Sequence, residues 1–235
     1  MARIPYVEVA PLFGVNIHSL CIAAAVLLGH FLMVWSAGAQ RHLAPGFSAA
    51  LVFGAAFGGH WLYLFLRPEL LRHHPVLLII PTAGASTLGA LFGAVIAASL
   101  HLRHSCQPIR IALFNSAAWA FPFAWVLARL GCFLAHDQAA LPYTGWLAVD
   151  YPTGPRHDLA LYEMLYAAIL AAVFFLARHR QWPFAAILLC SYGALRALIH
   201  PLRLALHTVD IVGATLVFAA GLAWLLVLSP RNQPS

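Results

Sequence analysis

Seven long apolar stretches follow one another along the chain, and they constrain its fold more than any other feature. Each is close to the ~20 residues that a helix needs to cross a bilayer. They lie at Val15–Trp35, Gly46–Leu66, Val76–Leu100, Ile111–Ala135, Leu159–Ala177, Trp182–Ile199 and Val209–Leu228. None shows the alternation of a barrel strand, and only helices or closed barrels satisfy the backbone in lipid. The sequence therefore predicts an all-α integral membrane protein with seven transmembrane helices in one bundle, a single polytopic membrane domain over residues 1–235.

The composition agrees with this class. Hydrophobic residues make up 63% of the chain and charged residues 9%, whereas about 25% of the residues of a soluble domain are charged. The net charge of +6 comes from arginines that are scattered along the chain. This pattern offers no basic tail or stripe for nucleic acid. The first span lacks an A-x-A cleavage site, so we expect it to remain as a helix.

The arginines in the connections give an expected orientation, because basic residues are enriched on the cytoplasmic side. If the N-terminus is outside, the inner connections and tail hold six arginines and the outer ones hold five. We therefore expect the N-terminus outside and the C-terminus in the cytoplasm.

Polar residues gather at one face of this expected bundle. The fourth and sixth spans end at the outer face, and the first and fifth spans begin there. The polar residues at these ends are His18, Arg129, His136, Asp137, Arg156, His157, Glu163, Tyr192 and Arg196. The connection 136–158 joins two of the ends and is rich in Pro, Gly, Asp and Tyr. We expect it to be an extramembrane loop that contributes to a site.

Two arginines lie inside apolar spans, Arg129 in the fourth and Arg196 in the sixth. A charged residue at bilayer depth costs roughly 2.5–3.5 kcal/mol and usually faces the interior of a bundle. An arginine near a helix end can instead extend to the membrane interface. Tyr192 and Arg196 have i, i+4 spacing and share a helix face. The neighbouring polar residues favour an anion site, and the most common anion in a membrane is a lipid phosphate.

Three short blocks carry a resemblance to a known family. The fourth span ends with A-R-L-G-C-F-L-A-H-D at 128–137, the fifth opens with R-H-D-L-A-L-Y-E at 156–163, and the sixth contains Y-G-A-L-R at 192–196. On these blocks the chain resembles the prolipoprotein diacylglyceryl transferases, whose motifs are G-R-x-G-N-F-x-N-G-E, R-H-P-S-Q-L-Y-E and Y-G-x-x-R. The resemblance covers most of the chain and implies a multi-pass enzyme of the bacterial inner membrane.

The resemblance also implies a reaction. A diacylglyceryl group would move from phosphatidylglycerol to the lipobox cysteine thiol in the signal peptide of a lipoprotein precursor, with no cofactor or metal. Positive groups must hold the phosphate, and a base must take the thiol proton. The implied phosphate-binding residues are Arg129, Arg156 and Arg196. The available candidates for the base are His136, Asp137 and His157, and we expect Glu163 and Tyr192 to complete the catalytic residues. Among these, Glu163 is expected to pair with an arginine and fix its position.

The chain departs from the family pattern at several polar positions. Where the family has the histidine of G-G-L-S-F-H-G-G, residues 83–90 read A-G-A-S-T-L-G-A, so Leu88 takes the place of the histidine. Two asparagines are replaced by Cys132 and Ala135, a glutamate by Asp137 and a tyrosine by Leu20. Two hypotheses follow. Either His136, Asp137 or His157 accepts the proton, or the chain is a catalytically silent lipid-binding protein of the same fold. A transporter is a third hypothesis, but no inverted repeat supports it.

Overall fold

The computed structural model describes residues 3–7, 9, 11, 12, 14–79, 84–204 and 208–227. The chain forms two compact units. The first consists of Met1–Leu32 with Asn115–Ser235, and the second consists of Met33–Phe114. The boundaries between the units fall within two of the long helices.

Six helices in the described part of the chain are long and apolar enough to cross a membrane. They are α1 (Ile17–Ser36), α2 (Ala44–Phe65), α5 (Gln107–Ala135), α6 (Leu159–Leu176), α8 (Thr208–Val227), and α7 (Phe184–Ile199) together with the 3-10 turn η3 (His200–Leu202) that follows it. Their ends lie within about one helical turn of six of the expected spans. The prediction of a multi-pass helical membrane protein is therefore confirmed.

The third expected span, 76–100, differs from the prediction. It opens with a short 3-10 turn, η2 (Pro75–Leu78), which follows the short helix α3 (Pro68–His73). Helix α4 (Thr87–His101) begins only after Ser86, whose hydroxyl accepts a hydrogen bond from the Gly89 backbone at 3.3 Å. The prediction of one continuous helix is wrong because this cap starts a new helix of 15 residues, shorter than the ~20 that cross a bilayer. Residues 80–83, which include Ala83, lie outside the described residues.

Glycines bring α2 and α4 together in the second unit. A Cβ atom on Gly54 would lie 2.2 Å from the carbonyl oxygen of Gly93, and one on Gly58 would lie 2.3 Å from that of Gly89. The two backbones are therefore in direct contact, as small residues allow for helices in lipid. Leu88, at the position of the family's histidine, is buried in α4.

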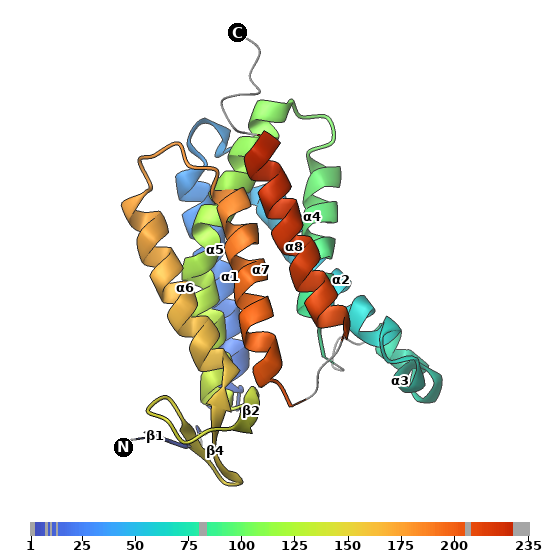
Figure 1. Cartoon of the computed structure of the whole chain (residues 1–235). Helices are drawn as coiled ribbons and strands as arrows, with labels where there is room; N and C mark the ends of the chain where they lie inside the picture. Colours follow the sequence, from blue (N-terminus) through green and yellow to red (C-terminus); the bar gives the residue numbers. More distant parts are fainter. Residues whose placement is uncertain are drawn as a thin grey trace. The chain divides into compact units, whose positions relative to one another are not determined.

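Residues 136–158 fold into most of a small sheet, which the sequence analysis did not predict. The strands are β2 (Ala139–Pro142), β3 (Val149–Tyr151) and β4 (Gly154–Asp158), and the N-terminal β1 (Ile4–Pro5) joins them. The strand order is β1-β3-β4-β2, with β1 parallel to β3 and the other pairs antiparallel. Figure 1 shows this sheet beyond the ends of α5 and α6. The all-α class therefore holds for the membrane helices but not for this connection.

Asp158 links the sheet to α6. Its side chain is fully buried, and one oxygen accepts the backbone N–H of Leu161 at 3.1 Å, which caps the helix. The hydroxyl of Tyr151 in β3 donates to the other oxygen at 2.6 Å. Burial raises the pKa of Asp158, and burial together with the bond to Asp158 raises the pKa of Tyr151. These bonds fix the start of α6.

The backbone contact of α2 with α4 leads to a stability prediction. Gly58→Ala should destabilise the protein by about 1–3 kcal/mol, because overpacking forces the helices apart. Gly59→Ala is the matched control, since its Cβ would lie no closer than 3.2 Å to the Ala90 side chain and 3.3 Å to the carbonyl oxygen of Ser86. Thermal unfolding of both variants in detergent measures the difference. Equal melting temperatures for the two variants would contradict the contact.

Candidate functional site

One carboxylate joins two arginines in the first unit. Glu163 lies in the second turn of α6, Arg129 near the end of α5 and Arg196 in the last turn of α7. The Nε atom of Arg129 lies 2.6 Å from Glu163 Oε2, and Nη1 of Arg196 lies 2.9 Å from Oε1. The second contact is a hydrogen bond, while the first is an ion pair without hydrogen-bond alignment. The ion pair that the sequence predicts for Glu163 is therefore present, and it involves both arginines.

This cluster is buried and carries an excess of positive charge. The side chains of Arg129, Arg196 and Glu163 are 17%, 11% and 3% exposed. Guanidinium groups remain charged at any physiological pH, so two positive charges face one negative charge. Tyr192, one turn before Arg196, is also buried and lies within electrostatic range of all three. Because an uncompensated buried charge is unfavourable, the cluster is suited to bind an anion.

Arg203 is a neighbour of this cluster that the sequence analysis did not single out. It follows α7 and forms its own ion pair with Asp210 at 2.8 Å. Burial lowers the pKa of Arg203, and the positive charge of Arg196 lowers it further. The pair with Asp210 is internally neutral and leaves the excess charge on Arg129 and Arg196. The sequence did not identify this pair, because an arginine and an aspartate seven residues apart on either side of a helix boundary form no recognisable motif.

A second polar group adjoins Arg129. It consists of His18 from the first turn of α1, Cys132 from the last turn of α5, and Asp137 just beyond. One donor atom from each residue lies within 4.8 Å of the others, and His18 Nδ1 is 3.9 Å from Asp137 Oδ2. Cys132 is buried, and its Sγ accepts a hydrogen bond from Arg129 Nη1 at 3.6 Å. This group therefore lies next to the arginine pair.

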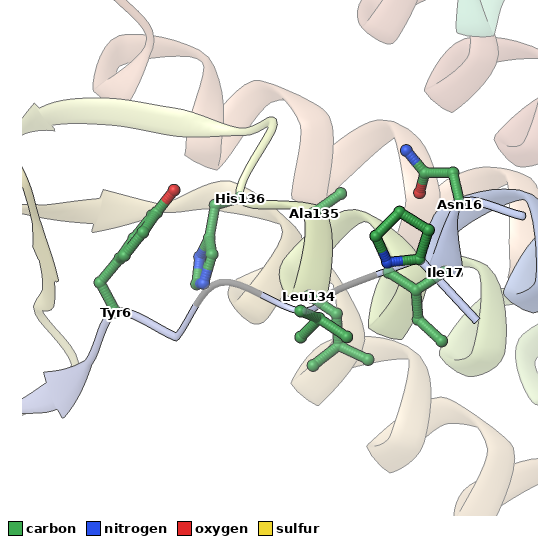
Figure 2. Close-up of a pocket in the computed structure, with 8 residues that line it drawn as sticks. Tyr6, Asn16, Ile17, Leu134, Ala135 and His136 are labelled. Carbon is green, nitrogen blue, oxygen red and sulfur yellow. The ribbon is translucent and has the colours of Figure 1, made fainter. Parts of the chain in front are cut away.

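His136 lies where the chain leaves α5 for the sheet. It has a positive φ of 52°, which turns the backbone away from the helix axis. Its ring stacks on Tyr6 with a centroid distance of 4.3 Å, and its Nε2 is 3.2 Å from the carbonyl oxygen of Val7. Figure 2 shows the two rings side by side at one end of a cavity of about 220 Å³. The other lining residues are Val9, Pro11, Asn16, Ile17, Leu134 and Ala135.

Arg156 and His157 belong to strand β4. The His157 ring stacks on Tyr143 at 4.0 Å, and its Nδ1 is hydrogen-bonded to the Tyr162 hydroxyl. Burial lowers the pKa of His157. Arg156 donates to the Thr153 hydroxyl at 3.0 Å and to the carbonyl oxygen of Ala140 at 3.2 Å. The bonds of Arg156 hold the sheet together, and that of His157 joins β4 to the first turn of α6; within the described chain none of them reaches Glu163.

The geometry thus separates the predicted site residues into two sets. Arg129, Glu163, Tyr192 and Arg196 form one cluster, and Asp137 lies in the group beside it. His136 faces the N-terminal segment, Arg156 makes its contacts within the sheet region, and His157 contacts Tyr143 and the start of α6. The roles assigned to all of these residues remain predictions.

The comparisons with known proteins identify a family. The model of the prolipoprotein diacylglyceryl transferase family matches residues 6–228, which is nearly the whole chain. The resemblance found from the three sequence blocks is therefore confirmed, and all of the predicted site residues lie within the matched range. The comparison with curated proteins finds no match.

The buried ion pairs lead to a stability prediction. Glu163→Gln should destabilise the protein by about 3–5 kcal/mol, because it leaves two buried guanidiniums without a carboxylate. Asp150→Asn is the control, since Asp150 pairs with Arg3 at the surface, where the side chains are 46% and 39% exposed and a pair contributes at most about 1 kcal/mol. Melting temperatures in detergent compare the two variants. If Glu163→Gln and Asp150→Asn have the same melting temperature, the buried cluster does not stabilise the helix ends.

Proposed function

The chain belongs to the prolipoprotein diacylglyceryl transferase family, and on this premise we propose that it moves a diacylglyceryl group from phosphatidylglycerol to the lipobox cysteine of a lipoprotein precursor. The family supports a transferase of lipoprotein biosynthesis in a bacterial membrane. The donor lipid, the acceptor thiol and the inner membrane are parts of the proposal. We also place the N-terminus and the sheet on the outer side of that membrane, following the arginine bias.

The observation that carries the proposal is the ion-pair arrangement of Glu163 with Arg129 and Arg196. A phosphodiester lipid carries one negative charge, which would balance the excess positive charge of this cluster. Arginine also presents several N–H donors in a plane that matches two phosphate oxygens. Because Glu163 holds both guanidiniums in place, little reorganisation is needed when the headgroup binds.

The same cluster would favour the reaction itself. The acceptor sulfur attacks the glyceryl carbon, the carbon–oxygen bond breaks, and its electron pair passes to the phosphate oxygen. The phosphate group gains negative charge during this step, as the diester becomes the monoester of the leaving glycerol phosphate. Fixed positive groups stabilise such developing charge more strongly than they stabilise the ground state. Arg129 and Arg196 would therefore contribute to catalysis as well as to binding, and Tyr192 would pack against them.

The thiol proton requires an acceptor, which the sequence analysis seeks among His136, Asp137 and His157. Asp137 lies in the group that contacts Arg129 through Cys132. His136 and His157 are stacked on tyrosines of the N-terminal segment and the 136–158 connection. We propose that the acceptor thiol loses its proton beside Asp137. His136 and His157 would shape the extramembrane part of the site, together with Arg156.

A catalytically silent lipid-binding protein is the second candidate. The observation that favours it is Leu88, which is apolar where the family has a histidine. Both candidates require the phosphate site, and they differ only in turnover. Transfer of the lipid group by the purified protein, from phosphatidylglycerol to a lipobox peptide, distinguishes them.

The arginine cluster leads to a prediction on transfer. Arg129→Lys and Arg196→Lys should each reduce the transfer rate by about 10²–10³-fold, since lysine keeps the charge but loses the planar donor fork. Arg178→Lys is the matched control, because Arg178 lies at the far end of α6 and donates to the carbonyl oxygen of Phe175. The rates are measured on the purified proteins in detergent with phosphatidylglycerol and peptide, at equal melting temperature.

Two results would change the proposal. Transfer at the wild-type rate by Arg129→Lys would show that the arginine only anchors α5 at the interface. A wild-type protein that binds phosphatidylglycerol but transfers nothing would favour the silent lipid-binding protein.

A further inference from the structure

We propose that His18, Cys132 and Asp137 form a three-ligand site for a borderline-soft divalent metal ion such as Zn²⁺, with one coordination position open. The family resemblance implies no metal, and these three residues form no motif of closely spaced ligands in the sequence. His18 and Cys132 lie on different helices and become neighbours only in the folded chain.

The backbone brings the three residues together. The carboxamide oxygen of Asn16 accepts the backbone N–H of His18 at 2.8 Å and fixes the start of α1. Helix α5 approaches α1 at Gly131, where a Cβ would lie 2.6 Å from the Cβ of Cys21 and 3.2 Å from the carbonyl oxygen of His18. Cys132 is the next residue along α5, and Asp137 follows at the end of that helix. The ligand positions are therefore set by close helix packing.

The distances suit a site that closes around an ion. One donor atom from each residue lies within 4.8 Å of the other two, and His18 Nδ1 is 3.9 Å from Asp137 Oδ2. Around tetrahedral Zn²⁺, with bonds of about 2.0–2.3 Å, ligand atoms are roughly 3.3–3.7 Å apart. Side-chain rotations that move the donor atoms by about 1 Å would close the site. Asp137 and His18 are partly exposed, which leaves room for such rotations.

The donor atoms are of the right chemical kind. The His18 Nδ1 atom is buried and has no hydrogen-bond partner in the described part of the chain, so its lone pair is available. A nitrogen, a sulfur and a carboxylate oxygen are the donors that Zn²⁺ takes in proteins, and three protein ligands with one open position are typical of catalytic sites. A thiolate disfavours Mg²⁺ and Ca²⁺, which prefer oxygen ligands.

The charges around the group also agree with a metal. Arg129 donates a hydrogen bond to the Cys132 sulfur, and contacts of this kind orient metal ligands. A divalent ion with one thiolate and one carboxylate is neutral overall. The excess positive charge on Arg129 and Arg196 would therefore still be available for a phosphate.

The open position gives the ion a role, which rests on the proposed function. A thiol that coordinates a divalent ion of this kind loses its proton outright. The acceptor cysteine would bind there as a thiolate, and its proton would pass to water. The sulfur would then attack the glyceryl carbon, and the carbon–oxygen electron pair would pass to the phosphate held by Arg129 and Arg196. A protein that activates the thiol in this way needs no histidine at the position of Leu88.

Cobalt binding tests the site directly, without reference to activity. Purified full-length protein in detergent is titrated with Co²⁺, which should give the visible bands of four-coordinate cobalt and a thiolate-to-cobalt charge-transfer band. Cys132→Ser should abolish the charge-transfer band, and His18→Gln and Asp137→Asn should each weaken Co²⁺ binding at least about tenfold. Cys190→Ser is the control and should keep the wild-type spectrum, because its sulfur contacts the carbonyl oxygen of Phe218 between α7 and α8.

Absence of the charge-transfer band in the folded wild type, or its persistence in Cys132→Ser, would overturn the site. If Cys132→Ser does not fold, the partly exposed Asp137 decides, and unchanged Co²⁺ affinity in Asp137→Asn would overturn it equally. Transfer assays separate this proposal from the proposed function. Cobalt binding without any transfer would retain the metal site and refute the transferase. Full transfer by the wild type after the metal is removed with a chelator, together with loss of transfer in Arg196→Lys, would refute the metal's role and retain the transferase.

Discussion

The functional half of the molecule depends on the ion pairs that a single buried carboxylate makes. Glu163 comes from α6, and its two oxygens meet Arg129 of α5 and Arg196 of α7. Guanidiniums cannot lose their charge, so without this carboxylate the ends of α5 and α7 would repel each other at low dielectric. The carboxylate compensates only one of the two positive charges. The cluster is therefore stable enough to hold three helix ends together and still suited to an anion.

The position of Glu163 depends in turn on the small sheet. Asp158 ends β4 and caps α6, and its second oxygen accepts a hydrogen bond from the hydroxyl of Tyr151 in β3. A chain of short contacts thus runs from the sheet to the start of α6 and, one turn later, to Glu163. This explains why the connection 136–158 is ordered rather than irregular. Its strands fix the helix that carries the central carboxylate.

The sequence predicts those features that depend on local pattern. Six membrane helices follow from the length of apolar runs, and Arg129, Glu163 and Arg196 stand out because charges are rare within such runs. The start of α4 was missed because Ser86 ends an apolar stretch with a side-chain cap, which hydropathy does not detect. The strands are too short to show a period. The group of His18, Cys132 and Asp137, and the pair of Arg203 with Asp210, depend on tertiary packing that spacing in the sequence does not reveal.

The departures from the family pattern are not spread evenly over the site. Arg129 and Arg196, together with Glu163 and Tyr192, match the family motifs. Cys132 and Asp137 replace an asparagine and a glutamate, and the structure brings both beside His18. These two departures therefore lie next to Arg129, outside its ion pair with Glu163. In the proposed reaction between a phospholipid and a thiol, this distribution would keep the residues that hold the donor and alter those that activate the acceptor. The proposed difference in how the thiol loses its proton rests on Cys132, because a thiol binds protons and metals as the amide of an asparagine cannot, while Asp137 keeps a carboxylate where the family has a glutamate.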